Sequence, residues 1–225
     1  MFESIAWACG LGISAVILYN MLHFFNLKMK YPHDTVSKLN AGIYQIYIIA
    51  WTIQNIINYK NINYSIDNSL IGYYLYDTIS LLMTPYGRSQ YIYFIHHILG
   101  IYIINLNITY HCSPLIYSNI LYFLMELSAC MLNWMKLLNE YYPGDFAKRF
   151  QLKTYAVYGV TRLFGLPVFI IDYSMNIYQP IWYQRIVISL LLLLYVLSVD
   201  WFIKMNRNKQ IKPINHDLET VSKSL

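Results

Sequence analysis

Two adjacent histidines, His96 and His97, stand inside a long apolar stretch of this sequence, where ionisable side chains are costly to bury. Two carboxylates, Asp77 and Glu126, stand inside the apolar stretches before and after them. Histidine is the usual proton carrier near neutral pH. A histidine pair beside a carboxylate could deprotonate an amine or hydroxyl, or accept an acyl group as a nucleophile. These four residues are the candidate catalytic set, and the alternative is that hydrogen bonds between helices simply satisfy the histidines.

A second group of polar residues accompanies them. Glu126 and Asn133 are seven residues apart, which places them on one face of a helix. Such a polar stripe must face protein or water rather than lipid. Gln45 and Tyr73 add polar groups in two other apolar stretches. The stripe therefore indicates either the lining of a cavity or contacts that hold helices together.

Arg162 is the basic residue of this group. A buried arginine cannot simply lose its proton, so it requires a partner. We expect Arg162 to be the counter-ion of Glu126 or Asp77 in a structural ion pair. Pro167, five residues later, is expected to kink the same helix.

The composition shows which kind of scaffold must position these residues. The 225-residue chain is 57% hydrophobic and only 12% charged, whereas soluble domains carry roughly 25% charged residues. The chain is therefore a membrane protein. Its net charge of +5 comes from residues placed between apolar runs, which fits membrane topology better than a nucleic-acid partner. The three cysteines form no metal-binding spacing, and we expect no metal site.

The predicted fold is an all-α integral membrane protein with about seven transmembrane helices. A bilayer core requires about 20 apolar residues per helix. Stretches of this kind lie at roughly 4–25, 41–59, 69–87, 90–110, 114–138, 152–172 and 180–203. The longest predicted loop is roughly 139–151. Lysine and arginine gather in alternate loops, which predicts a lumenal N-terminus and a cytosolic C-terminus.

The ordered motifs resemble those of the TLC-domain family. Ile71–Asp77 is similar to a Gly-Tyr-x-x-x-Asp helix of that family, and Phe94–Leu99 is similar to its paired-histidine segment. Glu126–Ser128, followed by Asn133, resembles a segment of the TLCD subgroup, and Arg162 matches an arginine late in the domain. The resemblance implies six helices around a membrane cavity, with one additional helix. It divides the chain into a first helix with a basic cytosolic loop at 1–34, a TLC-like multi-pass domain at 35–205 and a polar cytosolic tail at 206–225.

The resemblance also implies residence in the endoplasmic reticulum or another endomembrane, and a role involving lipids. Ceramide synthases, which belong to the family, transfer an acyl group from acyl-CoA to a sphingoid base, whereas other members regulate membrane composition or act as cargo receptors. Ceramide synthases carry an Asp-x-x-Asp motif where this chain has Glu126 and Ala129. Our first expectation is therefore a protein of membrane lipid homeostasis that binds an acyl chain.

Two alternatives stay open. One is an acyl-CoA-dependent lipid N-acyltransferase, similar to a sphingosine N-acyltransferase, in which the histidine pair carries the chemistry. The other is a trafficking receptor or transporter without chemistry. The expected partners are membrane lipids, with acyl-CoA or a sphingoid base for an acyltransferase, and no cofactor is expected beyond acyl-CoA as a co-substrate.

Overall fold

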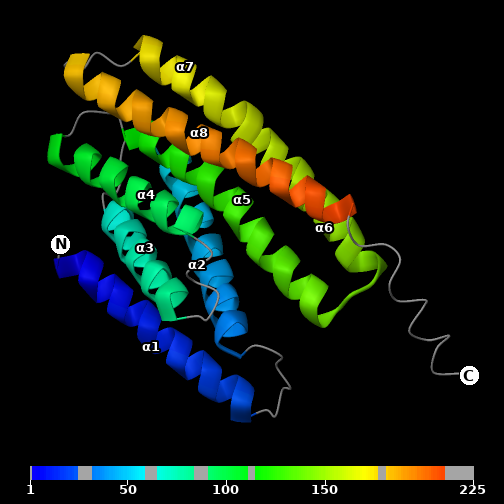
Figure 1. Ribbon diagram of the computed structural model, residues 1–225. Helices are drawn as coiled ribbons and strands as arrows, with labels where there is room; N and C mark the ends of the chain where they lie inside the picture. The colour runs from blue at the N-terminus through cyan, green and yellow to red at the C-terminus, as the bar shows by residue number, and fades with distance from the viewer. Residues whose placement is uncertain are drawn as a thin grey trace, which may run out of the picture.

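The computed structural model describes residues 2–24, 32–58, 65–83, 91–110, 115–176 and 181–210. Within these ranges the chain is helical and contains no strand, which confirms the predicted all-α fold (Figure 1). The helices are α1 (Phe2–Phe24), α2 (Pro32–Ile57), α3 (Ser65–Met83), α4 (Tyr91–Tyr110), α5 (Leu115–Tyr141), α6 (Asp145–Tyr158), the π-helix η2 (Gly159–Gly165), α7 (Leu166–Asn176) and α8 (Ile181–Gln210). Since α6, η2 and α7 follow one another without a break, they form one long helical segment.

Four helical stretches are long and apolar enough to cross a membrane by themselves: Phe2–Phe24, Ile116–Tyr141, Asp145–Met175 and Trp182–Arg207. The predicted fourth span contains a shorter apolar helix, Phe94–Leu106. The predicted spans in α2 and α3 fall below the same limits within the described residues, because both helices carry several polar side chains.

The polar side chains of α2 point into the protein. Asn40, Gln45 and Thr52 are all buried, whereas Ile43 and Ile46 are 52% and 51% exposed. A soluble protein places its residues the other way round. Exposed isoleucines and buried amides suit a helix whose solvent is lipid, because the polar groups must then find partners inside the protein.

Two predicted boundaries differ from the structure. The expected loop at 139–151 is much shorter, because α5 continues to Tyr141 and α6 begins at Asp145. Helix α8 continues to Gln210, into the predicted tail at 206–225, and the tail from 211 onward lies outside the described residues. In both places the apolar pattern stops before the helix does, since a helix can continue in the polar region beyond the hydrocarbon.

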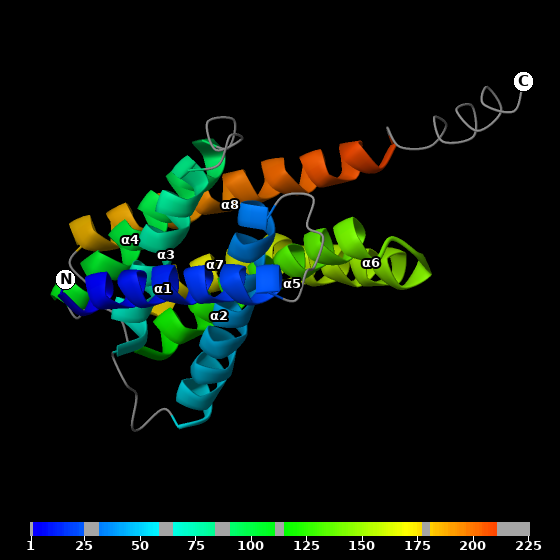
Figure 2. The same cartoon turned by 90° about the horizontal axis from the view of Figure 1, so that it is seen from below.

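Helix α5 lies between two apolar clusters. The first cluster joins α4, α5, α7 and α8, with Leu166 and Leu191 fully buried. The second cluster joins α1 to α5, with Ile48 and Leu70 fully buried. Figures 1 and 2 show α1 on one outer side of the bundle, against α3, and α7 with α8 on the opposite side. The polar side chains of α5 therefore lie between two apolar regions.

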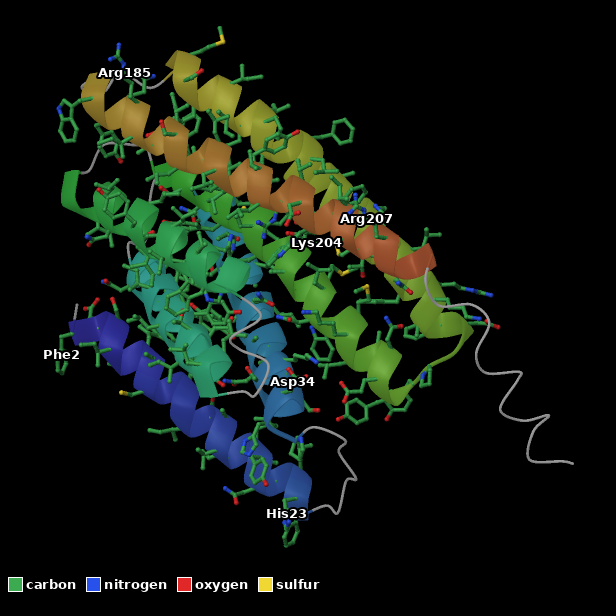
Figure 3. All side chains as sticks on the ribbon, in the orientation of Figure 1. Phe2, His23, Asp34, Arg185, Lys204 and Arg207 are labelled. Atoms are coloured by element: carbon green, nitrogen blue, oxygen red, sulfur yellow. The ribbon has the colours of Figure 1, made fainter. Side chains whose placement is uncertain are left out.

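Residues near the helix ends mark the two ends of the bundle. Phe2 and Arg185 lie toward one end of the bundle, and His23, Asp34 and Arg207 lie toward the other (Figure 3). The axis that joins these ends follows the long direction of α1 and α8.

Gly72 lies where α3 crosses α1. A Cβ atom at this position would lie 2.5 Å from the Trp7 Cβ and 2.6 Å from the Ser4 carbonyl oxygen. We expect Gly72→Ala to separate the two helices and to lower the free energy of unfolding by about 1–3 kcal/mol, measured by thermal unfolding in detergent. Gly10→Ala is the matched control, because Gly10 lies on α1, the other helix of this crossing, and has open space around it. Equal stability of the two variants would contradict this close crossing.

Candidate functional site

Glu126 lies near the middle of α5 and is only 3% exposed. Its Oε1 accepts a hydrogen bond from the Tyr74 hydroxyl at 2.8 Å, and its Oε2 accepts one from the Gln45 Nε2 at 3.2 Å. The carboxyl group therefore links α5 to α3 and α2. A buried carboxylate requires such partners, because hydrocarbon offers it none.

Gln45 connects the remaining members of this polar group. Its Nε2 also donates to the Tyr73 hydroxyl at 3.2 Å, and its Oε1 accepts from the Asn133 Nδ2 at 3.0 Å. Glu126 and Asn133 thus face the same side chain of α2, as their seven-residue spacing predicts. The two hydrogens and the oxygen of the Gln45 amide are all used. We name Gln45, Tyr73, Tyr74, Glu126 and Asn133 the glutamate network.

His97 faces α3. Its Nε2 lies 3.3 Å from the Asp77 Oδ2, and its Nδ1 lies 3.2 Å from the Thr78 hydroxyl. Its ring stacks on Tyr74 with 5.3 Å between the ring centroids. The structure therefore brings Asp77 together with His97, and Tyr74 connects this pair to the glutamate network. Both ring nitrogens of His97 are occupied, so the residue is held rather than free to accept a proton from a ligand.

Gly100 allows α4 to come this close to α3. A Cβ atom at Gly100 would lie 2.7 Å from the Tyr74 Cε2. Because Gly100 follows His97 by three residues, both lie on the same side of α4. A larger residue at position 100 would push the Tyr74 ring away from the position in which it reaches Glu126.

His96 faces a different neighbour, α8. Its ring centroid lies 5.9 Å from that of Trp201. No residue in the described part of the chain forms a hydrogen bond with either ring nitrogen of His96. Neighbouring helix residues point about 100° apart, so the two histidines face different helices. His97 has hydrogen-bond partners on α3, and His96 is the unengaged histidine, without such a partner among the described residues.

Arg162 does not form the expected ion pair. Within the described ranges, no carboxylate of Glu126 or Asp77 lies within 4.0 Å of it. Its Nε donates to the Ser128 hydroxyl at 2.6 Å, and its Nη2 donates to the Met125 carbonyl oxygen at 2.6 Å. Its Nη1 is buried and has no hydrogen-bond partner. Polar atoms of α5 thus bind Arg162 in place of the predicted carboxylate, and the Nη1 group has no hydrogen-bond acceptor.

The backbone around Arg162 is unusual. Arg162 is the central residue of the π-helix η2, which joins α6 to α7. A π turn inserts an extra residue into the helix, and such turns occur frequently at functional sites. Pro167, which was predicted to kink this helix, is the second residue after η2 and has no N–H group for the helix.

Several side chains around this centre were not predicted from the sequence. Tyr74 and Ser128 lie inside the motif segments but were not predicted as site residues, and Trp201 lies in a distant part of the sequence. Lys136 was also not predicted as a site residue, but it lies in α5 within electrostatic reach of Asp77. Its position three residues after Asn133 was the available signal.

A cavity of about 600 Å³ lies between α1, α2 and α3. None of the predicted site residues lines this cavity, and hydrogen-bonded side chains fill the glutamate network instead of leaving it hollow. Among the described residues, no group of three or more His, Cys, Asp and Glu side chains is placed to hold a metal ion.

The fold and the buried centre define an all-helical integral membrane protein with a polar interior and a lipid-facing exterior. The chain matches the TLC domain over residues 4–207, which is most of its length, and it belongs to the TLC-domain family. The resemblance seen in its motifs is thereby confirmed, and the match includes α1. The family is linked to lipid metabolism. No curated protein and no solved structure gave a significant match.

Ser128 tests how Arg162 is held. Ser128→Ala removes the acceptor of the Arg162 Nε and leaves a second buried N–H group without a partner. We expect a loss of about 1–3 kcal/mol in unfolding free energy, measured by thermal unfolding in detergent. Ser189→Ala is the matched control, because the Ser189 hydroxyl only donates to the Arg185 carbonyl oxygen on an exposed face. If both variants were as stable as the wild type, Ser128 would not hold the arginine.

Proposed function

We propose that this protein controls membrane lipid composition by binding a lipid whose polar part reaches Arg162 and His96. The observation that carries this proposal is the buried Nη1 of Arg162, which lacks a partner. A buried donor left without an acceptor costs roughly 1–3 kcal/mol, and more for a charged group. A lipid carbonyl, carboxylate or phosphate oxygen supplies the missing acceptor.

His96 supports the same location. It lies within electrostatic reach of Arg162, and its ring nitrogens are unengaged among the described residues. The two residues belong to α4 and η2, and both helices contact α8. A ligand oxygen between them would meet one fixed positive charge and one imidazole, which suits an acyl carbonyl or an anionic head group.

The surroundings favour a lipid over a water-soluble ligand. On the outside of α4 and α8, Ile98, Leu192 and Val196 are 50%, 48% and 60% exposed. A molecule that reaches the buried centre from this side must pass through an apolar surface. Exposed apolar residues of this kind face hydrocarbon in a membrane protein, so a lipid can approach without leaving the bilayer.

A lipid N-acyltransferase is the second candidate, and the unengaged His96 favours it. In this reaction His96 takes a proton from the amine of a sphingoid-type base, and the amine nitrogen attacks the thioester carbonyl of acyl-CoA. The C–S bond then breaks, and the thiolate leaves as CoA after it takes up a proton. His97 and Asp77 would position α3 and α4 instead of touching the substrate.

We further propose an endomembrane location, the endoplasmic reticulum first, with a lumenal N-terminus and a cytosolic C-terminus. The basic residues Lys28, Lys30 and Lys38 follow the end of α1, and Lys204 and Arg207 lie near the end of α8. Figure 3 places His23 and Arg207 toward the same end of the bundle. A common basic end is the cytosolic one by the positive-inside rule.

The two histidines allow function to be separated from stability. We expect His96→Ala to abolish the lipid change that the wild type causes in expressing cells, as measured by lipidomics at matched expression. His97→Ala should instead lower thermal stability, because Asp77 and Thr78 lose their partner. His23→Ala, an exposed histidine at the end of α1, is the control.

If the reaction is acyl transfer, N-acylated lipids rise with the wild type. His96→Ala should then slow transfer from acyl-CoA in vitro by roughly 100-fold or more, the usual contribution of a general base. A wild type that leaves lipids unchanged, or a fully active His96→Ala variant, would contradict the proposed site.

The orientation can be tested with epitope tags at the two termini. After selective permeabilisation of the plasma membrane, an antibody should reach the C-terminal tag and not the N-terminal tag, because the basic end stays in the cytosol. Detergent permeabilisation of all membranes is the control that exposes both tags. Access to the N-terminal tag alone would reverse the proposed orientation.

A further inference from the structure

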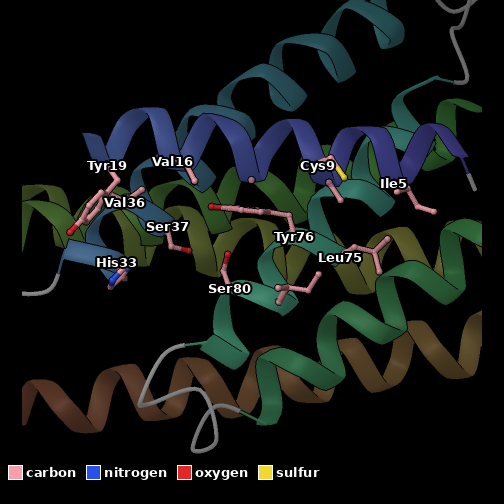
Figure 4. Close-up of a pocket in the computed structure, with 14 residues that line it drawn as sticks. Ile5, Cys9, Val16, Tyr19, His33, Val36, Ser37, Leu75, Tyr76 and Ser80 are labelled. Atoms are coloured by element: carbon pink, nitrogen blue, oxygen red, sulfur yellow. The ribbon is translucent and has the colours of Figure 1, made fainter. Parts of the chain in front are cut away.

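The cavity of about 600 Å³ between α1, α2 and α3 is a groove with an almost entirely apolar lining (Figure 4). Its wall on α1 includes the small residues Ala8, Gly12 and Ala15, and Leu75 and Ile79 of α3 also line it. The small residues leave space where larger side chains would fill the gap between the helices. A Cβ atom at Gly12 would have no neighbour within 4 Å.

The groove is polar at one end only. His33 and Ser37 of α2 and Ser80 of α3 gather at the end near Tyr19, whereas Ile5 marks the apolar end (Figure 4). The Tyr19 and His33 rings stack with 5.4 Å between their centroids. The lining thus matches an amphiphilic ligand. Hydroxyl and imidazole groups lie at one end of the groove, and apolar side chains line the rest.

The polar end of the groove lies toward the end of the bundle that carries His23 and Arg207 (Figure 3). The sequence between α1 and α2 carries Lys28 and Lys30, and His23 lies at the exposed end of α1. This is the side that the proposed orientation places in the cytosol. Basic residues at the cytosolic surface of a membrane attract the phosphate groups of lipid heads.

We propose that the groove holds one acyl chain of a membrane lipid, with its polar head beside His33, Ser37 and Ser80. From Ile5 to Tyr19 the groove follows α1 for roughly 21 Å at 1.5 Å per residue, more than half of a hydrocarbon core about 30 Å thick. If a methylene group takes about the volume of a water molecule, ~30 Å³, the cavity holds a chain of roughly 20 carbons.

A protein helix is too wide to enter this groove fully. A helix about 10 Å wide and roughly 21 Å long would occupy ~1,600 Å³, well over twice the cavity volume of about 600 Å³. An acyl chain therefore matches the groove better than a helix from a second copy of this chain. Because α1 exposes Ile13 and Ile17 to lipid on its outer face, bilayer chains already surround the entrance.

This groove is distinct from the polar centre of the proposed function. Glu126, His96 and Arg162 do not line it. The inference stands whether or not a lipid reaches Arg162, and it goes beyond the proposed function by assigning a second, chain-binding site to α1.

Photo-crosslinking tests the groove. The probe is a phosphatidylcholine with a diazirine midway along one chain, in nanodiscs of unlabelled phosphatidylcholine that contain the full-length protein. Labelled positions are mapped by mass spectrometry. We expect labelling of groove positions such as Cys9 and Ile79 to exceed labelling of the outer positions Ile13 and Ile17.

Gly12→Leu fills the groove, and Gly10→Leu is its matched control, because both glycines have open space and Gly10 does not line the groove. We expect Gly12→Leu to lower the ratio of groove to outer labelling by about tenfold, whereas Gly10→Leu leaves it unchanged. Ala15→Phe is a second filling variant in case Gly12→Leu fails to elute as a folded species. An unchanged ratio in folded variants would overturn the proposal, as would equal labelling of groove and outer face in the wild type.

Two further measurements separate the remaining outcomes. His96→Ala should keep the wild-type labelling ratio, so a failure of the proposed function does not affect this result. Cys9 lines the groove and is exposed, and its oxidation reports a second copy of the chain. Efficient Cys9 dimer formation together with weak groove labelling would show that another protein chain covers the groove, and would overturn the lipid assignment.

Discussion

A carboxyl group buried in the hydrocarbon of a bilayer can obtain hydrogen bonds only from the protein, and this constraint organises the interior of the bundle. Glu126 obtains them from Tyr74 of α3 and Gln45 of α2. Because each donor has further partners, the requirement of one side chain on α5 determines how three helices face one another. The polar residues that lower the hydropathy of α2 are therefore the same residues that hold it in place.

The same constraint explains why the adjacent residues His96 and His97 differ in their hydrogen bonding. His97 belongs to the part of the interior where every polar group is matched, since Asp77 and Thr78 occupy its nitrogens. His96 and the Nη1 of Arg162 lie where the matching is incomplete. Stability thus resides mainly in the matched groups, and chemistry or binding is proposed for the unmatched ones. The π-helix that carries Arg162 fits this division, because irregular backbone in a membrane is tolerated where protein surrounds it.

Membrane lipid acts on this protein in two ways, as its solvent and as a proposed ligand. Over most of the surface it is the solvent, in contact with exposed residues such as Ile43 of α2 and Val196 of α8. At the groove along α1 and at the unmatched groups near α8, it would instead be a ligand with a defined position. The two regions lie on opposite sides of the glutamate network. Helices α2 and α3, which line the groove, are joined to α5 by the hydrogen bonds that Gln45 and Tyr74 donate to Glu126.

The sequence by itself determined the class of the protein and most of its helices, because an apolar run of sufficient length has no stable form in a bilayer other than a helix. It also determined that Glu126 and Asn133 share a face, since the helical repeat places residues seven apart on one side. The tertiary structure alone decided which helix this face meets, which histidine is engaged, and that Ser128 and a backbone carbonyl hold Arg162. These outcomes depend on crossing positions such as Gly72 and Gly100, where contacts between residues distant in sequence set the distance between helices, and no local pattern encodes that distance.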